Sequence, residues 1–430
     1  MRFGELKTMA ARETADELDL ESRLGSIQSQ LRQFEDDPLI IDRARGIYLY
    51  DTTGHRLLDS MAGYWLACLG YGDPEIVKTL ARASERLSFW HIFETAHSPV
   101  LRYVGELQKY LPDALRGKIL FANTGSAAME NALRVACARD AQLRRKSVLA
   151  HFDRSYHGST FLAQQATPWN DWPDSLRLPE GRVQQIPSPS SNSRAQQCIE
   201  ALDTLCRGEH APTMLLTEPI QGVGGMVVPP AGFFDELAAV CRRNEITWIS
   251  DEISTGFGST GRLFAFEWNT ALPDIVVVGK KIAAGYFPMS GAIISQQLAC
   301  DVLEDRPFHY GYSTSGHPVG CEVARVVLRR VSDPKLLSNV ISRGVQLRTG
   351  LEEIKKHRGV IRSVCGEGLM VAAELPKSDF THKIGQKMRE LGVYQLPEGK
   401  YLTFCPAFVI SPEEIDELLN VVDRAIVECS

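Results

Sequence analysis

The stretch VVVGKKIAAGYFP, residues 276–288, carries the pattern that decides the fold. A run of β-branched residues, Ile275 to Val278, ends in a glycine and is followed by two adjacent lysines, Lys280 and Lys281. A run this apolar predicts a strand that is buried on both faces, as in a parallel sheet covered by helices. Lysines after such a strand either mark its exit to solvent or supply an amine nucleophile to a pocket.

Similar apolar runs recur along the chain and are separated by segments of helical pattern. They are KILFAN (118–123), SVLAHF (147–152), TMLLTE (213–218), ITWISDE (246–252), DIVVVG (274–279) and GAIIS (291–295). DELAAVCRRN (235–244) is amphipathic and has the length of a crossover helix. The series predicts an α/β protein whose large domain holds a mainly parallel sheet covered by helices.

The flanking segments differ from this central pattern. GIYLYDTTGHRLLDSMAG (46–63) alternates like a pair of strands, and the chain after Pro318 is first helical and then mixes short strands with a last helix at 412–428. Residues 168–194, rich in Pro, Ser and Trp, are expected to form a surface excursion. We expect both ends to meet in a smaller α+β domain. The predicted division is 1–70 for a polar N-terminal arm and part of the small domain, 71–318 for the large domain, and 319–430 for the C-terminal part of the small domain.

Composition argues against several classes of function. The 430 residues carry a net charge of −6, which does not favour a nucleic-acid partner or an anionic membrane surface. No run approaches the ~18 apolar residues of a membrane helix, and the charged opening MRFGELKTMAARETADELDLESRLG has no secretory apolar region. Ten scattered cysteines without CxxC or metal-ligand spacing indicate reduced thiols, a cytoplasmic location and no metal site.

Two motifs follow predicted strands at the edge where open α/β sheets bind ligands. In FANTGSAAMENALRVA (121–136), Gly125 and Ser126 lie between a strand and a helix, where free N–H groups suit a phosphate, although a plain helix cap has the same pattern. In RSYHGST (154–160), Tyr156 either stacks on a planar heterocycle or packs within a turn.

Asp251 ends the strand in WISDEISTGFGSTGRLF (248–264), where it should be buried. An ionised carboxylate there is costly unless it meets a cation, such as a protonated ring nitrogen. GFGSTG in the same stretch matches the dinucleotide-binding pattern, but no crossover helix opens after it and the acidic residues precede the glycines. We therefore interpret these glycines as a turn.

A phosphate site, an aromatic ring, a buried acid and a lysine at the strand ends of one sheet together predict pyridoxal 5'-phosphate as cofactor. The motifs that carry them are NTGSAAMENALR, SYHGST, DEISTGFGSTGRLFA, PDIVVVGKK and YSTSGHPVG. In order and spacing the chain resembles the class III (omega-type) aminotransferases of the fold-type I pyridoxal-phosphate enzymes, over roughly residues 40–425. The resemblance implies a large domain with a mainly parallel mixed sheet and a smaller α+β domain from both chain ends.

The resemblance implies a role for each matching residue. Lys280 corresponds to the Schiff-base lysine and general acid/base, and Lys281 stands where the family usually has glycine or alanine. Asp251 corresponds to the partner of the pyridine nitrogen. The further cofactor contacts that it implies are Gly125, Ser126, Tyr156, His157, Glu218, Ile253, Ser313 (from the neighbouring subunit) and Thr314 as its fallback. The implied substrate contacts are Tyr64, Trp65, Gln221 and Arg154.

One departure from the family bears on the substrate. Relatives often carry an arginine near the C-terminus that binds a substrate carboxylate in a two-pronged contact. The corresponding positions hold Leu396 or Thr403, with Lys400 nearby. Either the carboxylate is bound elsewhere, for example by Arg154, or the preferred substrate lacks one. We therefore expect amino groups on non-α carbons.

The resemblance implies a homodimeric aminotransferase with active sites at the subunit interface. It would move an amino group from an amine or amino-acid donor to a ketone or aldehyde in two ping-pong half-reactions. Because fold does not fix reaction, an aminomutase or a decarboxylating enzyme of the same fold remains an alternative. An NAD-dependent dehydrogenase built on GFGSTG would tolerate Lys280→Ala, and a catalytically silent homologue would have no reason to keep Lys280 and Asp251 together with the phosphate turn.

Overall fold

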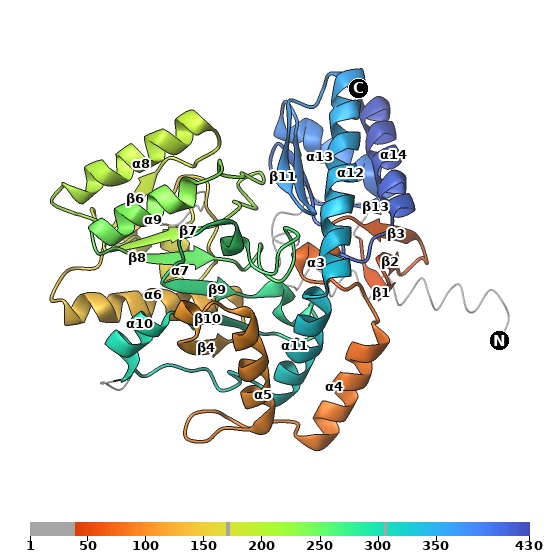
Figure 1. Ribbon diagram of the computed structural model, residues 1–430. Helices are drawn as coiled ribbons and strands as arrows, with labels where there is room; N and C mark the ends of the chain where they lie inside the picture. The colour runs from red at the N-terminus through yellow and green to blue at the C-terminus, as the bar shows by residue number, and fades with distance from the viewer. Residues whose placement is uncertain (1–38, 169–172, 305–307) are drawn as a thin grey trace.

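The computed structural model describes residues 39–168, 173–304 and 308–430. Its centre is a seven-stranded sheet of order β4-β10-β9-β8-β7-β5-β6 (Figure 1). Its strands are β4 (Lys118–Ala122), β10 (Ser290–Ile294), β9 (Ile275–Val278), β8 (Thr247–Asp251), β7 (Met214–Thr217), β5 (Leu149–Phe152) and β6 (Val183–Ile186). β10 is antiparallel to β4 and β9, and the other neighbours are parallel. The predicted N-terminal arm falls in residues 1–38, outside the described residues.

All six apolar runs predicted as strands are present in this sheet, but two features differ from the prediction. The run at 291–295 lies in β10, the antiparallel strand. The expected surface excursion at 168–194 contains the edge strand β6. Its sequence is VQQI, in which only Ile186 is buried. An edge strand has little need of a continuous apolar run, so the periodicity signal was missing.

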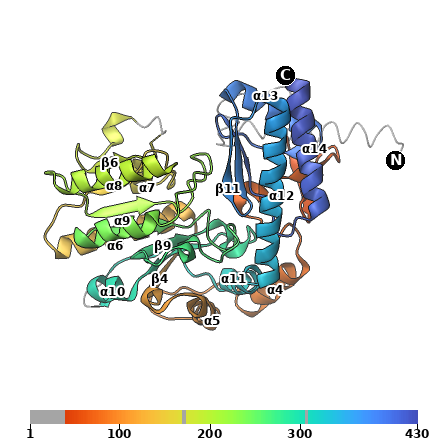
Figure 2. The same ribbon diagram turned by 45° about the horizontal axis from the view of Figure 1, so that its top comes forward.

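Helices cover both faces of the sheet, as Figures 1 and 2 show. The main ones are α6 (Gly125–Gln142), α8 (Asn192–Cys206) and α9 (Phe233–Arg243). Leu216 and Ile249 pack in the cluster that contains α6, whereas Leu215 and Trp248 pack in the cluster that contains α8 and α9. Successive side chains of a strand point to opposite faces. A strand between two helical layers is therefore apolar at every position.

Segments from both ends of the chain meet beside the large sheet. One small sheet contains β1 (Ile41–Arg45), β2 (Tyr48–Asp51), β3 (Arg56–Asp59) and β13 (Val393–Tyr394). In this sheet Val393 pairs with Leu58 in parallel register. The other small sheet contains β11 (Ser363–Glu367), β12 (Met370–Glu374) and β14 (Tyr401–Phe404), and the nearby helices are α12 (Pro334–Arg358), α13 (Ser378–Glu390) and α14 (Pro412–Cys429) (Figure 1). The exact domain boundaries stay a prediction.

The remaining helices are shorter or lie at the edge of the large sheet. They are α3 (Ala62–Trp65), α4 (Pro74–Arg86), α5 (Ser98–Leu107), α7 (Phe161–Gln165), α10 (Gln296–Ala299) and α11 (Pro318–Val331). Short 3-10 turns span Gln108–Tyr110, Asp113–Leu115, Asp174–Leu176, Ala265–Trp268 and Lys280–Ala283, and a π-turn spans Cys300–Glu304. Within the described ranges, no helix is long and apolar enough to cross a membrane.

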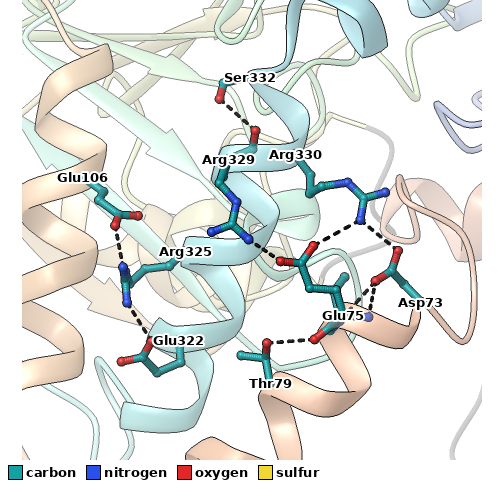
Figure 3. A network of polar contacts seen from close by, with 10 residues as sticks. Asp73, Glu75, Thr79, Glu106, Glu322, Arg325, Arg329, Arg330 and Ser332 are labelled. Atoms are coloured by element: carbon teal, nitrogen blue, oxygen red, sulfur yellow. Dashed lines mark hydrogen bonds and ion pairs between the residues drawn. The ribbon is translucent and has the colours of Figure 1, made fainter.

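Ion pairs join α11 to α4 and α5 (Figure 3). Arg330 of α11 lies 3.2 Å from Asp73, which caps α4. Arg325 of α11 lies 2.6 Å from Glu106 of α5. These contacts fix the middle and the C-terminal end of α11 against α4 and α5.

Two helix glycines predict opposite effects of the same substitution. A Cβ at Gly344 of α12 would lie 1.9 Å from the carbonyl oxygen of Gly368, whereas a Cβ at Gly105 of α5 would meet nothing within 4 Å. Gly344→Ala should lower the free energy of unfolding by about 1–3 kcal/mol, because overpacking outweighs the better helix propensity of alanine. Gly105→Ala should raise it by about 0.5–1 kcal/mol. Chemical denaturation measures both changes, and equal changes would contradict the close approach of α12 to Gly368.

Candidate active site

Five segments with predicted site residues meet where strands of the large sheet end. β8 ends at Asp251, and β9, β7, β5 and β4 lead directly to Lys280, Glu218, the 154–160 segment and Gly125. These strands run in one direction, so their carboxyl ends share one edge of the sheet, the edge at which open α/β folds bind ligands. The topology thus brings distant parts of the sequence to one place.

Asp251 and His157 form a buried pair at this edge. Oδ2 of Asp251 and Nδ1 of His157 are 2.8 Å apart, and the backbone N–H of Ile253 donates to Oδ1 of Asp251 at 3.0 Å. Asp251 is 5% exposed and His157 is 1% exposed. A buried carboxylate is stable only when donors surround it. The pair therefore fixes a hydrogen-bond acceptor at the end of β8.

The Lys280 amine is enclosed at the end of β9. Its Nζ donates to Oγ of Ser254 at 3.0 Å and lies 4.3 Å from the ring centroid of Trp65. Burial, and next the charge of Lys281, lower the pKa of Lys280 to about 8, against the opposing effect of two nearby carboxylates. An amine with this pKa is partly unprotonated near neutral pH and is able to act as a nucleophile or a base.

The neighbouring lysine, Lys281, is also buried. Its Nζ donates to the backbone carbonyl oxygen of Ser254 at 2.7 Å, and burial lowers its pKa. Ser254 therefore holds both lysines, Lys280 through its hydroxyl and Lys281 through its carbonyl. No sequence pattern indicated Ser254, because a serine in a loop does not reveal that two lysines from the end of another strand contact it.

The turn before α6 is stabilised by its own residues. Thr124 is the N-cap, and its Oγ1 accepts a first-turn N–H at 3.2 Å. Ser126 is not needed as a cap, and its Oγ accepts the N–H of Ser159 at 3.1 Å. A Cβ at Gly125 would lie 2.9 Å from Cδ1 of Ile253, so glycine permits this close approach. The start of this helix offers positive potential to an anion beside Ile253 and Ser159.

Glu218 links the Tyr156 loop to the segment after β7. Its Oε1 accepts the N–H of Tyr156 at 2.9 Å and its Oε2 accepts the N–H of Gly222 at 3.2 Å. Burial raises the pKa of Glu218 to about 7. Tyr156 remains 39% exposed and is therefore accessible to a ligand. Gln221 is fully buried beside this segment.

Tyr64 and Trp65 form one wall of the site. Both have positive φ, 62° and 74°, and their rings stack with centroids 5.5 Å apart. The Tyr64 ring centroid lies 5.6 Å from Nζ of Lys280, and the Tyr64 hydroxyl donates to Oε1 of Glu398 at 2.5 Å. Glu398 was missed by the sequence analysis, because no motif connects it with residues more than three hundred positions earlier.

The other predicted residues have different surroundings. Arg154 donates to the carbonyl oxygen of Gly224 and to the hydroxyl of Tyr401, the latter at 2.6 Å. Oγ1 of Thr314 accepts from the side-chain amide of Asn123 at 2.6 Å, and Ser313 is exposed. Among the described contacts, none joins Ser313 or Thr314 to the Lys280 amine.

The glycines of GFGSTG (256–261) form a turn that packs inside the protein. A Cβ at Gly261, which has φ +83°, would lie 2.3 Å from Cγ1 of Ile341 in α12. The next element is only the short 3-10 turn at Ala265–Trp268. The interpretation of these glycines as a turn is confirmed, and nothing here resembles a dinucleotide-binding helix start.

Several buried polar atoms of the site residues lack a hydrogen-bond partner in the described part of the chain. They are Nε1 of Trp65, Nε2 of His157 and both amide atoms of Gln221. Since buried polar groups are nearly always hydrogen-bonded, these atoms indicate a site built for an additional group. An amine, a fixed carboxylate, a helix start and an accessible aromatic ring are the features that pyridoxal phosphate requires. The described residues contain no group of three or more His, Cys, Asp or Glu placed to hold a metal ion.

Comparison with known proteins identifies the family, because the model of class-III aminotransferases matches residues 32–426. The chain belongs to this family. The putrescine–pyruvate aminotransferase of Pseudomonas aeruginosa is 28% identical to it over 90% of each chain. The solved (S)-enantioselective omega-transaminase of Thermomicrobium roseum is 28% identical, with a TM-score of 0.88 over 98% of each chain. A PLP-bound amine transaminase from an uncultivated Pseudomonas species is 26% identical, with a TM-score of 0.86 over 95% of this chain and 98% of that one.

As a class-III aminotransferase, the protein is a pyridoxal-phosphate-dependent enzyme of fold type I. The predicted fold class, cofactor and reaction are confirmed, and the comparisons give no support to the aminomutase or decarboxylating alternative. Pyridoxal phosphate, when bound, draws electrons away from the substrate carbon that carries the amino group. The site described above supplies an amine at the end of β9 and a carboxylate at the end of the adjacent strand β8.

Lys281→Met should raise the pKa of Lys280 from about 8 toward its ordinary 10.5, because the Lys281 charge is the largest cause of the lowered pKa after burial. The fraction of free amine at neutral pH should fall accordingly. The measurement is a 13C NMR titration of apoenzyme labelled at the lysine ε-carbons, with the Lys280 signal assigned from Lys280→Met. Lys400→Met is the matched control, because the Lys400 amine pairs with Glu374. An unchanged pKa in Lys281→Met would contradict the electrostatic coupling.

Proposed function

We propose that Lys280 is the catalytic lysine of this aminotransferase and that Asp251 is its electrostatic counterpart. The observation that carries the proposal is the enclosed Lys280 amine, with a pKa of about 8, in the same site as the buried Asp251–His157 pair. Lys280 holds the cofactor in the resting enzyme, and its free amine moves the proton of the substrate carbon that bears the amino group. Asp251 holds a proton on the ring nitrogen, and His157 fixes the orientation of that carboxylate.

The other predicted residues complete the cofactor site in this proposal. The start of α6, at Gly125 and Ser126, receives the phosphate. Tyr156 stacks on one face of the ring, and Ile253 lies beside the phosphate turn, where it limits the space for the ring. Glu218 fixes the Tyr156 loop through the backbone hydrogen bond described above. Gln221, whose amide atoms lack partners, and the wall formed by Tyr64 and Trp65 face the substrate.

We infer that the amino group that this enzyme transfers lies on a non-α carbon. Relatives of the chain include putrescine–pyruvate, gamma-aminobutyrate and vanillin aminotransferases. The positions of the expected carboxylate-binding arginine hold Leu396 and the buried Thr403, and Lys400 pairs with Glu374. Arg154, the remaining candidate, is bound to a carbonyl oxygen and to the Tyr401 hydroxyl. A carboxylate next to the reacting amine would therefore have to displace existing contacts.

The decisive test is the visible absorption spectrum of the purified protein and of Lys280→Ala. Wild type should bind pyridoxal phosphate with a yellow absorption that amine donors bleach and carbonyl acceptors restore. Lys280→Ala should lose transamination by at least about a thousandfold, because both the covalent attachment and the proton transfer are removed. Lys400→Ala should retain the spectrum and the activity. Full activity of Lys280→Ala would assign the catalytic amine elsewhere.

We also propose a cytoplasmic homodimer in which Ser313, with Thr314 as the alternative, completes the phosphate site of the partner subunit. The exposure of Ser313 and the absence of any disulfide among the ten cysteines, all free thiols, support this proposal. The affinity for pyridoxal phosphate should then fall on dilution below the dissociation constant of the dimer, and Ser313→Ala should weaken it in the dimer. Sedimentation velocity together with cofactor titration measures both effects, and a monomer that binds the cofactor equally well would overturn the proposal.

A further inference from the structure

A tight hairpin places Glu398 beside the substrate wall. The N–H of Glu398 donates to the carbonyl oxygen of Tyr401 at 2.9 Å, and the N–H of Tyr401 donates back at 3.0 Å. Gly399 has φ +56°, a conformation that glycine adopts at no steric cost. The backbone of the hairpin is thus fixed, and the Glu398 side chain extends to the hydroxyl of Tyr64 at 2.5 Å.

Glu398 is within electrostatic reach of the reacting amine. Burial raises the pKa of Glu398, and the hydrogen bond from Tyr64 and then the positive charge of Lys280 oppose this effect. Burial raises the pKa of Tyr64, and the charge of Glu398 is the next largest cause. The pKa of Tyr156 is raised by burial, then by the charge of Asp251 and then by that of Glu398. These are residues of the proposed cofactor and substrate sites. Tyr64 gives the geometric link, because its hydroxyl binds Glu398 and its ring centroid lies 5.6 Å from Nζ of Lys280.

The basic side chains around the Glu398 turn, Lys400 and Arg154, are engaged with other groups. Lys400, two residues along the hairpin, lies 2.6 Å from a carboxylate oxygen of Glu374. Arg154 binds the Tyr401 hydroxyl at 2.6 Å and the carbonyl oxygen of Gly224. In the described parts of the chain, Glu398 has no ion pair, although it is only partly exposed. A carboxylate in this position gains stability from an added cation, because one hydrogen bond from a phenol is a weak substitute for a counter-charge.

We propose that Glu398, together with the ring of Tyr64, is a subsite for an ammonium group at the far end of the amine donor. The preferred donors are then α,ω-diamines or related amines with a second positive charge. The Glu398 carboxylate attracts the second ammonium group through a charge-assisted hydrogen bond, and the face of the Tyr64 ring favours the same cation. The same charge disfavours donors that end in a carboxylate. This inference rests on the proposed function, since it assumes that the first amine reacts at the Lys280 site.

The experiment compares wild-type holoenzyme with Glu398→Gln, which keeps the shape and the acceptor oxygen but removes the charge. The donors are straight-chain α,ω-diamines, n-alkylamines of equal carbon number, and the corresponding ω-amino acids. The readouts are kcat/KM with a carbonyl acceptor and the dissociation constant of each amine from isothermal titration calorimetry. Glu209→Gln, in an exposed loop before β7, makes the same change in net charge and serves as the control.

Glu398→Gln should lower kcat/KM for the diamines by about tenfold or more, leave the alkylamines nearly unchanged and improve the ω-amino acids, whereas Glu209→Gln should alter none of these ratios. An unchanged ratio of diamine to alkylamine would overturn the inference, as would a wild-type preference for ω-amino acids. A loss of dimer stability in Glu398→Gln without a change in this ratio would also overturn it, because Glu398 would then pair with the partner subunit. If no donor is converted but the charge-dependent binding of diamines persists, the inference stands and the proposed reaction fails.

Discussion

Burial of the Lys280 amine is the constraint on which the rest of the site depends. In water a lysine amine has an ordinary pKa of 10.5 and is almost fully protonated near neutrality. The enclosure of Nζ by the Trp65 ring and by Ser254 removes the hydration of the charged form, so that the pKa falls to about 8. Such an enclosure requires a wall of side chains beyond the end of the sheet. This explains why residues from the N-terminal segment, the central sheet and the β8–β9 loops all contribute.

Carboxylates near a buried lysine would normally cancel this effect, because they favour the ammonium form. In this site the environment of one of these carboxylates, Glu218, limits that effect on Lys280. Burial raises the pKa of Glu218 to about 7, so that Glu218 is only partly ionised near neutral pH. Lys281 acts in the opposite direction: the thiols of Cys405 and Cys68 are the groups whose charge would act on its amine, and burial raises the pKa of both thiols, that of Cys68 to about 12. With neutral thiols around it, the Lys281 charge acts on Lys280 without an opposing anion beside it.

The central fold and most of the candidate site could be predicted from the sequence for a physical reason. A parallel sheet requires strands that are apolar at every position, and a cofactor at its edge requires polar residues immediately after them, so that both signals lie in the same short stretches of sequence. The sequence pattern was absent where a strand is not apolar throughout or where a site residue does not directly follow a strand. β6 is an edge strand with polar residues, and Ser254 and Glu398 act through contacts between loops that are distant in sequence. Such contacts depend on how separate loops pack in three dimensions, which no local pattern encodes.

The two halves of the site are therefore built in different ways. The groups to which we assign the chemistry, Lys280 and Asp251, stand at the ends of hydrogen-bonded strands in the core. The groups that we propose to face the distal part of a substrate, Tyr64 and Glu398, stand on a short helix and on a tight turn from opposite ends of the chain. In this proposal, a change of charge in that turn alters which substrates the site attracts. The pKa of the Lys280 amine at the strand end remains governed mainly by burial. If Glu398 binds the distal ammonium group as we propose, the choice of donor is made by a few residues in the turn between β13 and β14, while the strand ends of the large sheet stay the same.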